Sequence, residues 1–245
     1  MPDWTWAAMV VFSGYVVLGL TGFGSALVIV PLLAWQWPLP HVVALTLLLD
    51  LPACLLHGAL NFRHVRWPEI RRLLPGMLLG SAAGLWLMHV LEPRWPLLML
   101  GLYVCWMGLR QMRPSALQAA SLPACAPTFA GVLAGLVEMM FGSAGPVLMT
   151  WLRWRVSNVM HMRATAPALI VCSAFIVLGQ MAVTGHLSDT DLWHHWLWLI
   201  TAALLGTVLG HRMALHVSKT LLTRAIALLL MASGLVLVKR FFTVD

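Results

Sequence analysis

A four-residue sequence, Phe-Gly-Ser-Ala, occurs twice in the chain, at residues 23–26 and 141–144, each time inside a long apolar stretch. Glycine lets an oxyanion approach the backbone closely, and the serine adds a hydroxyl donor. If a helix breaks at each copy, the half-helix that follows offers free N–H groups and the positive end of its dipole. The repeat therefore predicts one anion site to which both copies contribute. The candidate substrate-binding residues are Gly22, Phe23, Gly24, Ser25, Phe141, Gly142, Ser143 and Ala144.

Small residues in apolar helices also have a purely structural use, because they let two helix backbones approach closely. We expect the pairs Gly80 with Gly84 and Gly206 with Gly210 to serve this purpose. A single Phe-Gly-Ser-Ala sequence would be interpreted in the same way. Its duplication favours the anion site instead.

Two acidic side chains lie at a depth in the apolar segments where an ionisable group is costly and usually functional. Asp50 is near the middle of the segment 42–61, and Glu138 lies four residues before Gly142. Neither acid is repeated in the other copy. We hypothesise that Asp50 or Glu138 carries a coupling proton, with His57 as a relay partner, because removal from water disfavours the charged carboxylate. The alternative is a protonated acid that only hydrogen-bonds to a neighbouring helix.

Further polar side chains accompany these acids at helical spacing. Three of them follow Asp50 and form one stripe with it on a helix. The segment 164–185 carries others, which either line a path opposite that stripe or bond across helices. The path-lining candidates are Cys54, Asn61, Ser173 and Gln180.

The composition requires a lipid bilayer around these residues. Hydrophobic residues make up 61% of the chain and charged residues 9%, and the mean hydropathy is +0.88, which leaves too little polar surface for a water-soluble domain. The net charge of +7 comes from Lys and Arg in short loops, so we expect no nucleic-acid partner. The four cysteines are scattered without a Cys-x-x-Cys pair, and neither a metal site nor a cofactor is expected.

Helix is the expected structure of every apolar segment, because lipid-exposed backbone must satisfy its own hydrogen bonds. We interpret the chain as a single integral membrane domain, 1–245, in which a polar linker, 113–126, separates an N-terminal repeat, 1–112, from a C-terminal repeat, 127–245. The apolar segments are 5–34, 42–61, 68–91, 95–112, 127–151, 164–185, 192–216 and 220–240.

The positions of the fifteen Lys and Arg residues test how these segments cross the membrane. If every segment crosses once, eight cations lie on one side and seven on the other. If the first segment of each repeat breaks at its glycines and returns to the same face, twelve lie on one side and only Arg94, Lys239 and Arg240 on the other, as the positive-inside rule favours. The predicted fold is therefore an all-α polytopic membrane protein with two inverted repeats. Each repeat has one broken re-entrant helical hairpin, with arms of about 20 Å in the first, and three transmembrane helices.

The chain resembles the sulfite exporter TauE/SafE family. Residues 22–33, Gly-Phe-Gly-Ser-Ala-Leu-Val-Ile-Val-Pro-Leu-Leu, are similar to the signature that opens each half of that family, and residues 131–146 look like its second copy. The basic loop 61–67 and the run 75–84 are also similar. This resemblance covers essentially the whole chain. It implies secondary transport of a small sulfur-containing or organic anion, such as sulfite, a sulfonate or sulfoacetate, across a bacterial inner membrane.

Two departures from the family signature leave the substrate open. Ser25 and Ala26 stand where the signature has glycines, and the second copy lacks the Val-Pro that follows the first. Extra bulk at the breaks would reshape the pocket.

Other functions are weighed against a proton-coupled transporter. A passive anion channel would need no coupling acid. An intramembrane serine hydrolase would use Ser143 as nucleophile with His161 or His186 as base, but a hydrolase has little use for a duplicated motif. We expect a transporter rather than an enzyme, with a small anion as its ligand and a homodimer as one option for its assembly.

Overall fold

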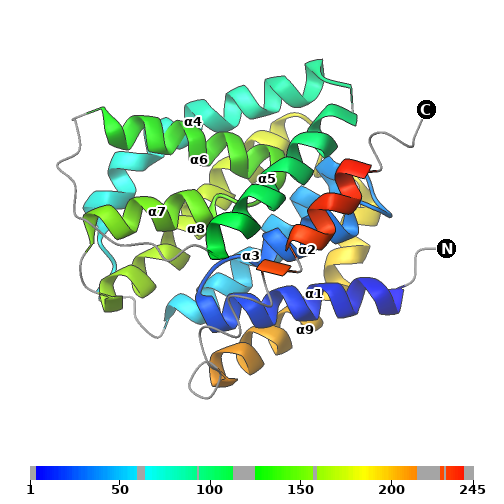
Figure 1. Cartoon of the computed structure of the whole chain (residues 1–245), viewed down its shortest axis with the longest axis horizontal. Coiled ribbons are helices and arrows are strands. Elements are labelled where there is room, and N and C mark those ends of the chain that lie inside the picture. The colour runs from blue at the N-terminus through cyan, green and yellow to red at the C-terminus, as the bar shows by residue number, and fades with distance from the viewer. Residues whose placement is uncertain are drawn as a thin grey trace.

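The computed structural model describes residues 4–59, 64–92, 94–112, 125–156, 159–213, 227–228 and 230–239 (Figure 1). All regular elements within these residues are helices, as predicted. In chain order they are α1 (Trp4–Thr21), α2 (Ser25–Leu33), α3 (Leu39–Ala59), α4 (Trp67–Val90), α5 (Arg94–Met112), α6 (Ala126–Phe141), α7 (Gly145–Arg155), α8 (Val159–Val183) and α9 (Thr190–Met213). A further helix covers Leu230–Lys239.

Among the described helices, five are long and apolar enough to cross a membrane, namely α1, α3, α4, α8 and α9. Four of them, α3, α4, α8 and α9, lie on segments that the sequence predicts as single helices. The protein is therefore an all-α membrane protein with several spanning helices.

Two of the predicted segments are split, each at its copy of Phe-Gly-Ser-Ala. The segment 5–34 forms α1 and α2, and the segment 127–151 forms α6 and α7. The arms of the first pair are unequal, because α1 has 18 residues, or about 27 Å, and α2 has only 9. The expectation of two arms of about 20 Å is wrong here, because the break at residues 22–24 lies past the middle of the segment 5–34 and leaves a short second arm.

Two closely packed helix pairs lie at opposite edges of the molecule (Figure 1). α1 packs along α9, and α4 packs along α6. Glycines make both contacts, because a Cβ atom on Gly80 would collide with the carbonyl oxygen of Val132, and one on Gly210 with that of Val16. Close packing at the expected glycine pairs is confirmed, and the partner helices, α1 and α6, are those that lead into the two breaks.

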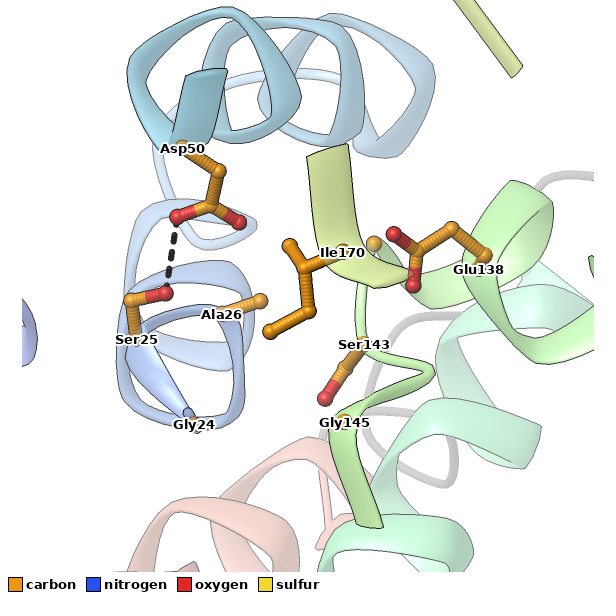
Figure 2. Close-up of a pocket in the computed structure, with 9 residues that line it drawn as sticks. Gly24, Ser25, Ala26, Asp50, Glu138, Ser143, Gly145 and Ile170 are labelled. Atoms are coloured by element: carbon orange, nitrogen blue, oxygen red, sulfur yellow. Dashed lines mark hydrogen bonds between the residues drawn. The ribbon is translucent and has the colours of Figure 1, made fainter. Parts of the chain in front are cut away.

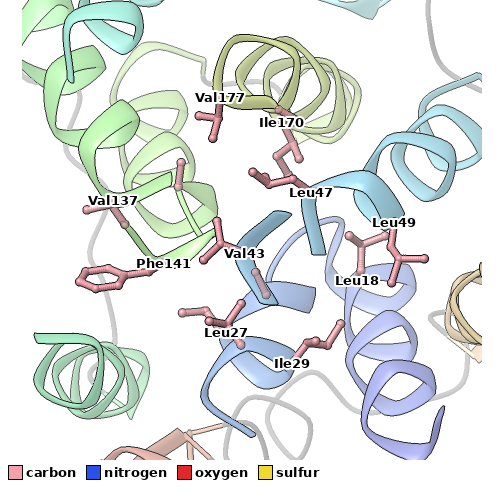
Figure 3. Close-up of a cluster of buried hydrophobic side chains, with 14 of the residues drawn as sticks. Leu18, Leu27, Ile29, Val43, Leu47, Leu49, Val137, Phe141, Ile170 and Val177 are labelled. Carbon is pink, nitrogen blue, oxygen red and sulfur yellow. The ribbon is translucent and has the colours of Figure 1, made fainter. Parts of the chain in front are cut away.

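The helices α3 and α8 pack on each other between these edges. Buried apolar side chains from α2, α3, α6 and α8 meet there, as Figure 3 shows. Because lipid tails are as apolar as these side chains, close packing rather than escape from water holds such helices together. The core thus fixes α3 and α8 beside the two breaks. Its members include Leu27, Ile29, Val43, Leu47, Val137, Phe141, Ile170 and Val177.

The first broken pair begins and ends at the same end of a neighbouring helix. Trp4 lies at the start of α1 and Trp37 just after α2, and both contact the ring of His195 in the second turn of α9. The ring centroids are 5.0 Å and 4.4 Å apart, respectively. His41, at the start of α3, is also 2.9 Å from His195 through Nε2 and Nδ1. The chain therefore returns to its starting level after passing the first break.

The second broken pair begins and ends near the start of α4. Gly131, in the second turn of α6, packs against the backbone of Leu73. Arg155, the last residue of α7, forms a salt bridge of 3.4 Å with Glu69, which also pairs with Arg72 at 3.0 Å. This pair, too, returns to the level at which it starts.

Candidate functional site

Glycines in the left-handed backbone region form both breaks. The φ angle is 84° at Gly22, 94° at Gly24 and 62° at Gly142. A Cβ atom is disfavoured at such angles, which explains the residue type. The helix α2 begins directly after Gly24, and α7 begins at Gly145. Each break is thus a tight glycine turn that is followed by a helix N-terminus.

The two breaks line one pocket, which is drawn in Figure 2. A Cβ atom on Gly145 would lie 3.3 Å from the Phe23 ring, so the second break contacts the first. In Figure 2, Ile170 of α8 lies between Asp50 on one side and Glu138 on the other. The free space has room for about one water molecule, so a larger solute requires the walls to separate. The lining residues are Gly24, Ser25, Ala26, Asp50, Glu138, Gly142, Ser143, Gly145 and Ile170.

Asp50 brings the first carboxyl group to the pocket from α3. Its Oδ1 atom accepts hydrogen bonds of 2.8 Å from both the Ser25 hydroxyl and the Tyr15 hydroxyl. The residue is 3% exposed. Asp50 therefore connects three helices, α1, α2 and α3, at the first break.

Glu138 brings the second carboxyl group to the pocket from α6. Its Oε2 atom accepts a hydrogen bond from the backbone N–H of Ala144, and its Oε1 atom accepts one of 3.0 Å from the Ser173 hydroxyl of α8. The residue is 2% exposed. One N–H group of the second break, which the sequence assigns to substrate, is thus already bonded to a carboxyl group of the protein.

The pocket combines groups that attract an anion with groups that repel one. The first residues of α2 and α7 line it, and helix N-termini favour negative charge. Its ionisable residues are Asp50 and Glu138, and none of the described lining residues is Lys or Arg. Away from bulk water, two carboxylates would strongly oppose the entry of a third negative charge. An anion therefore enters most favourably when these carboxyl groups hold protons.

The other predicted site residues lie at varying distances from the pocket. Cys54 is buried one turn after Asp50 in α3. Phe141 stacks on Tyr103, with centroids 5.5 Å apart. Gln180 donates a 3.3 Å hydrogen bond to the carbonyl of Leu78 on α4, which is the cross-helix alternative considered above. The side chain of His57, all of Asn61 and most of the linker 113–126 lie outside the described residues.

Two tyrosines at the breaks were not identified from the sequence. Tyr15 bonds to Asp50, and the Tyr103 hydroxyl donates a 3.0 Å hydrogen bond to the Ser143 carbonyl. The chain has only two tyrosines, and each lies inside an apolar segment. A lone polar hydroxyl in such a segment was the sequence feature that could have identified them. The lining residues Ala26, Gly145 and Ile170 were missed as well.

The two histidines considered as bases for Ser143 lie in other contacts. His161 Nδ1 is 2.8 Å from the carbonyl oxygen of His64. His186 Nδ1 is 2.9 Å from the Thr184 hydroxyl, and burial together with His89 lowers the pKa of His186. Neither is among the residues that line the pocket with Ser143.

Comparison with known proteins gives matches along nearly the whole chain. Residues 6–237 match the family model described as Sulfite exporter TauE/SafE. The chain is 41% identical over 198 residues to a Comamonas testosteroni protein named "Probable inner membrane transporter protein TsaS", a match that covers 81% of this chain and 83% of the relative. No solved structure matches the chain.

Proposed function

Because the chain belongs to the sulfite exporter TauE/SafE family, we propose that it carries a small sulfur-containing or organic anion across the bacterial inner membrane as a proton-coupled secondary transporter. The family and the relative are membrane transporters, so the chain is a transporter and not an enzyme. Sulfite, sulfonates and sulfoacetate are the proposed substrate class. The observation that carries the proposal is that both breaks and two buried carboxyl groups line the same pocket.

The anion binds, in this proposal, at the N-termini of α2 and α7. Backbone N–H groups of their first turns and the hydroxyl groups of Ser25 and Ser143 are the donors. Gly24 and Gly142 permit close approach to the backbone, and their neighbours Gly22, Phe23, Phe141 and Ala144 form the rest of the two turns. An oxyanion with several oxygen atoms suits donors that converge from two sides.

The proton binds at Asp50 or Glu138. Both carboxyl groups are buried and share the pocket with the anion, so protonation removes the charge that would repel it. Release of the proton restores the repulsion and favours release of the anion. Binding of the two is therefore mutually favourable, which is the thermodynamic requirement for coupling.

The transport pathway alternates, we propose, between two inverted repeats, 1–112 and 127–245, which the linker 113–126 joins within one domain. The first broken pair returns to the level of His195 and the second to that of Glu69, which supports two re-entrant hairpins. In the topology that the charge count favours, α9 starts at the periplasmic face and α4 at the cytoplasmic face. The hairpins then enter from opposite sides, as in other transporters with inverted repeats.

Purified protein in proteoliposomes tests this function. Uptake of radiolabelled sulfite and sulfoacetate is measured with a pH gradient, without one, and after a protonophore collapses it. We expect the gradient to drive accumulation above the external concentration, and Asp50→Asn to abolish that accumulation. Downhill flux that ignores the gradient would identify a passive channel and contradict proton coupling.

Assembly is a separate question. A homodimer remains a prediction, and light scattering of the detergent-solubilised protein after size exclusion measures the mass that decides it.

A further inference from the structure

Each buried carboxyl group has a hydroxyl neighbour with two acceptors in reach. The Tyr15 hydroxyl is 2.8 Å from Asp50 Oδ1 and 3.3 Å from the carbonyl oxygen of Thr46 in α3. The Ser173 hydroxyl is 3.0 Å from Glu138 Oε1 and 2.9 Å from the carbonyl oxygen three residues earlier in α8. A hydroxyl group has one proton to donate, so it serves one of these acceptors at a time.

The two acceptors match the two states of each carboxyl group. When the carboxyl group is ionised, the hydroxyl donates to it. When the carboxyl group is protonated, its own O–H donates to the hydroxyl oxygen, and the hydroxyl proton turns to the helix carbonyl. In either state, the Tyr15 or Ser173 hydroxyl and the carboxyl O–H each have an acceptor, which avoids the cost of an unsatisfied buried group.

We propose that Tyr15 and Ser173 are positioning residues for the transported proton, and that each hydroxyl turns between carboxyl group and helix carbonyl as the proton binds and leaves. The inference rests on the proposed proton coupling at Asp50 and Glu138. It extends that coupling to two residues behind the pocket wall. Through this exchange, each carboxyl group titrates without a rearrangement of the packed helices around it.

Other ionisable groups near the two acids affect the same protonation equilibria. Among the described residues, Asp50 interacts electrostatically with Tyr15 of α1, Cys54 of α3 and Glu138 of α6. Glu138 interacts with Asp50 and Cys54 and accepts the N–H of Ala144. The test therefore follows both carboxyl groups together.

A serine elsewhere in the bundle provides a matched control. Ser81 of α4 is fully buried, and its hydroxyl donates a 3.1 Å hydrogen bond to the carbonyl oxygen of Leu78, three residues earlier, as Ser173 does in α8. No carboxyl group is among its described hydrogen-bond partners. Ser81→Ala thus removes a hydroxyl of the same geometry without touching the proton site.

Infrared spectroscopy of the reconstituted full-length protein tests the inference without any substrate. A protonated carboxyl group gives a C=O stretching band that a carboxylate lacks, and Asp50→Asn and Glu138→Gln assign the band to its two sources. The band is followed against pH in wild type, Tyr15→Phe, Ser173→Ala and Ser81→Ala. The hydroxyl bonds to both forms of the carboxyl group, but its hydrogen bond to the charged form is the stronger. Deleting the hydroxyl should therefore move the midpoint of the affected carboxyl group upward by about one pH unit.

The outcomes separate this inference from the function on which it rests. The inference is supported if the midpoint of the carboxyl band shifts in Tyr15→Phe and Ser173→Ala. It should stay at the wild-type value in Ser81→Ala and in Ser173→Thr, which keeps a hydroxyl group. Midpoints equal to wild type in both hydroxyl deletions would overturn it, even if the proteoliposomes show proton-driven uptake. The proposed function fails on a different result, which is wild-type flux that ignores the pH gradient.

Discussion

The two breaks share a four-residue sequence but differ in where their carboxyl group comes from. At the first break, Asp50 reaches in from α3 and accepts the hydroxyl of Ser25. At the second, Glu138 lies on α6 itself, six residues before the N–H of Ala144 that it accepts. The repeated sequence therefore gives a glycine break at both places, while the tertiary contacts decide from which element the carboxyl group comes.

In the proposed mechanism, this difference assigns distinct consequences to the two protons. A proton on Asp50 would change the contact of α3 with the two helices of the first broken pair, α1 and α2. A proton on Glu138 would change its bond to the Ala144 N–H within the second broken pair and its contact with Ser173 of α8. Asp50 therefore acts on a broken pair from a neighbouring helix, whereas Glu138 acts from within one.

The largest effects are expected from side chains at the turn glycines. Gly24→Val and Gly142→Val should each lower the transport rate at least tenfold without preventing membrane insertion, because a β-branched residue is strained at positive φ.

The comparison is sharpened with asparagine, which tolerates φ near 60°. Gly142→Asn should therefore keep more activity than Gly24→Asn, whose φ of 94° lies farther from that region. Gly179→Ala, in open space on α8, is the control, and equal loss in both asparagine variants would contradict this account.

Neutral replacements of the acids come next. Asp50→Asn and Glu138→Gln mimic the protonated state, so each should abolish accumulation driven by the pH gradient while keeping anion exchange between the two sides of the vesicle. Radiolabelled uptake and counterflow measure the two activities separately. If only one variant loses accumulation, that acid carries the proton and the other is structural.

A smaller effect is expected from the two serines, and it should differ in kind. Ser25→Ala removes a hydroxyl that bonds to Asp50 as well as lining the pocket, so the pH at which uptake is half-maximal should rise together with KM. Ser143→Ala removes a hydroxyl that lines the pocket, so KM should rise about two- to tenfold at an unchanged pH profile. Initial rates over a grid of pH and substrate concentration check both. Identical changes in the two variants would remove the distinction between the breaks.

The smallest effect is expected at the second tyrosine. Tyr103→Phe deletes a hydrogen bond to the Ser143 carbonyl, which is neutral backbone. We expect the thermal midpoint to fall by about 2–4 °C, with the pH profile of uptake unchanged. A shift in that profile would mean that Tyr103 also acts on a proton site.

Much of the framework of the site could be predicted from local sequence. The two breaks follow from Gly24 and Gly142, because glycine is the residue that a tight turn with positive φ requires. Asp50 and Glu138 were found because an acid in an apolar segment is conspicuous. Their use as a coupled proton site remains a prediction.

What local sequence could not give depends on which helices are neighbours. Tyr15 lies 35 residues from Asp50 in sequence, and only the packing of α1 and α3 against the same helix, α9, brings their side chains together. The N–H of Ala144 was expected to be free for substrate, but the glutamate one turn before the break accepts it. The short return arm α2 was missed because two equal arms were assumed, although the glycines of the break lie nearer the end of the segment 5–34 than its start.

Two helix pairs, each of which joins the first half of the chain to the second, limit how the molecule can move. α1 from the first part of the chain is fastened to α9 from the last part, and α6 is fastened to α4 in the opposite sense, in both cases at glycine contacts where backbones touch. In each proposed repeat, the first helix, α1 or α6, thus packs on a helix of the other repeat. The repeats cannot swing apart as separate lobes, and a gene fragment that encodes either one alone leaves that first helix without its groove.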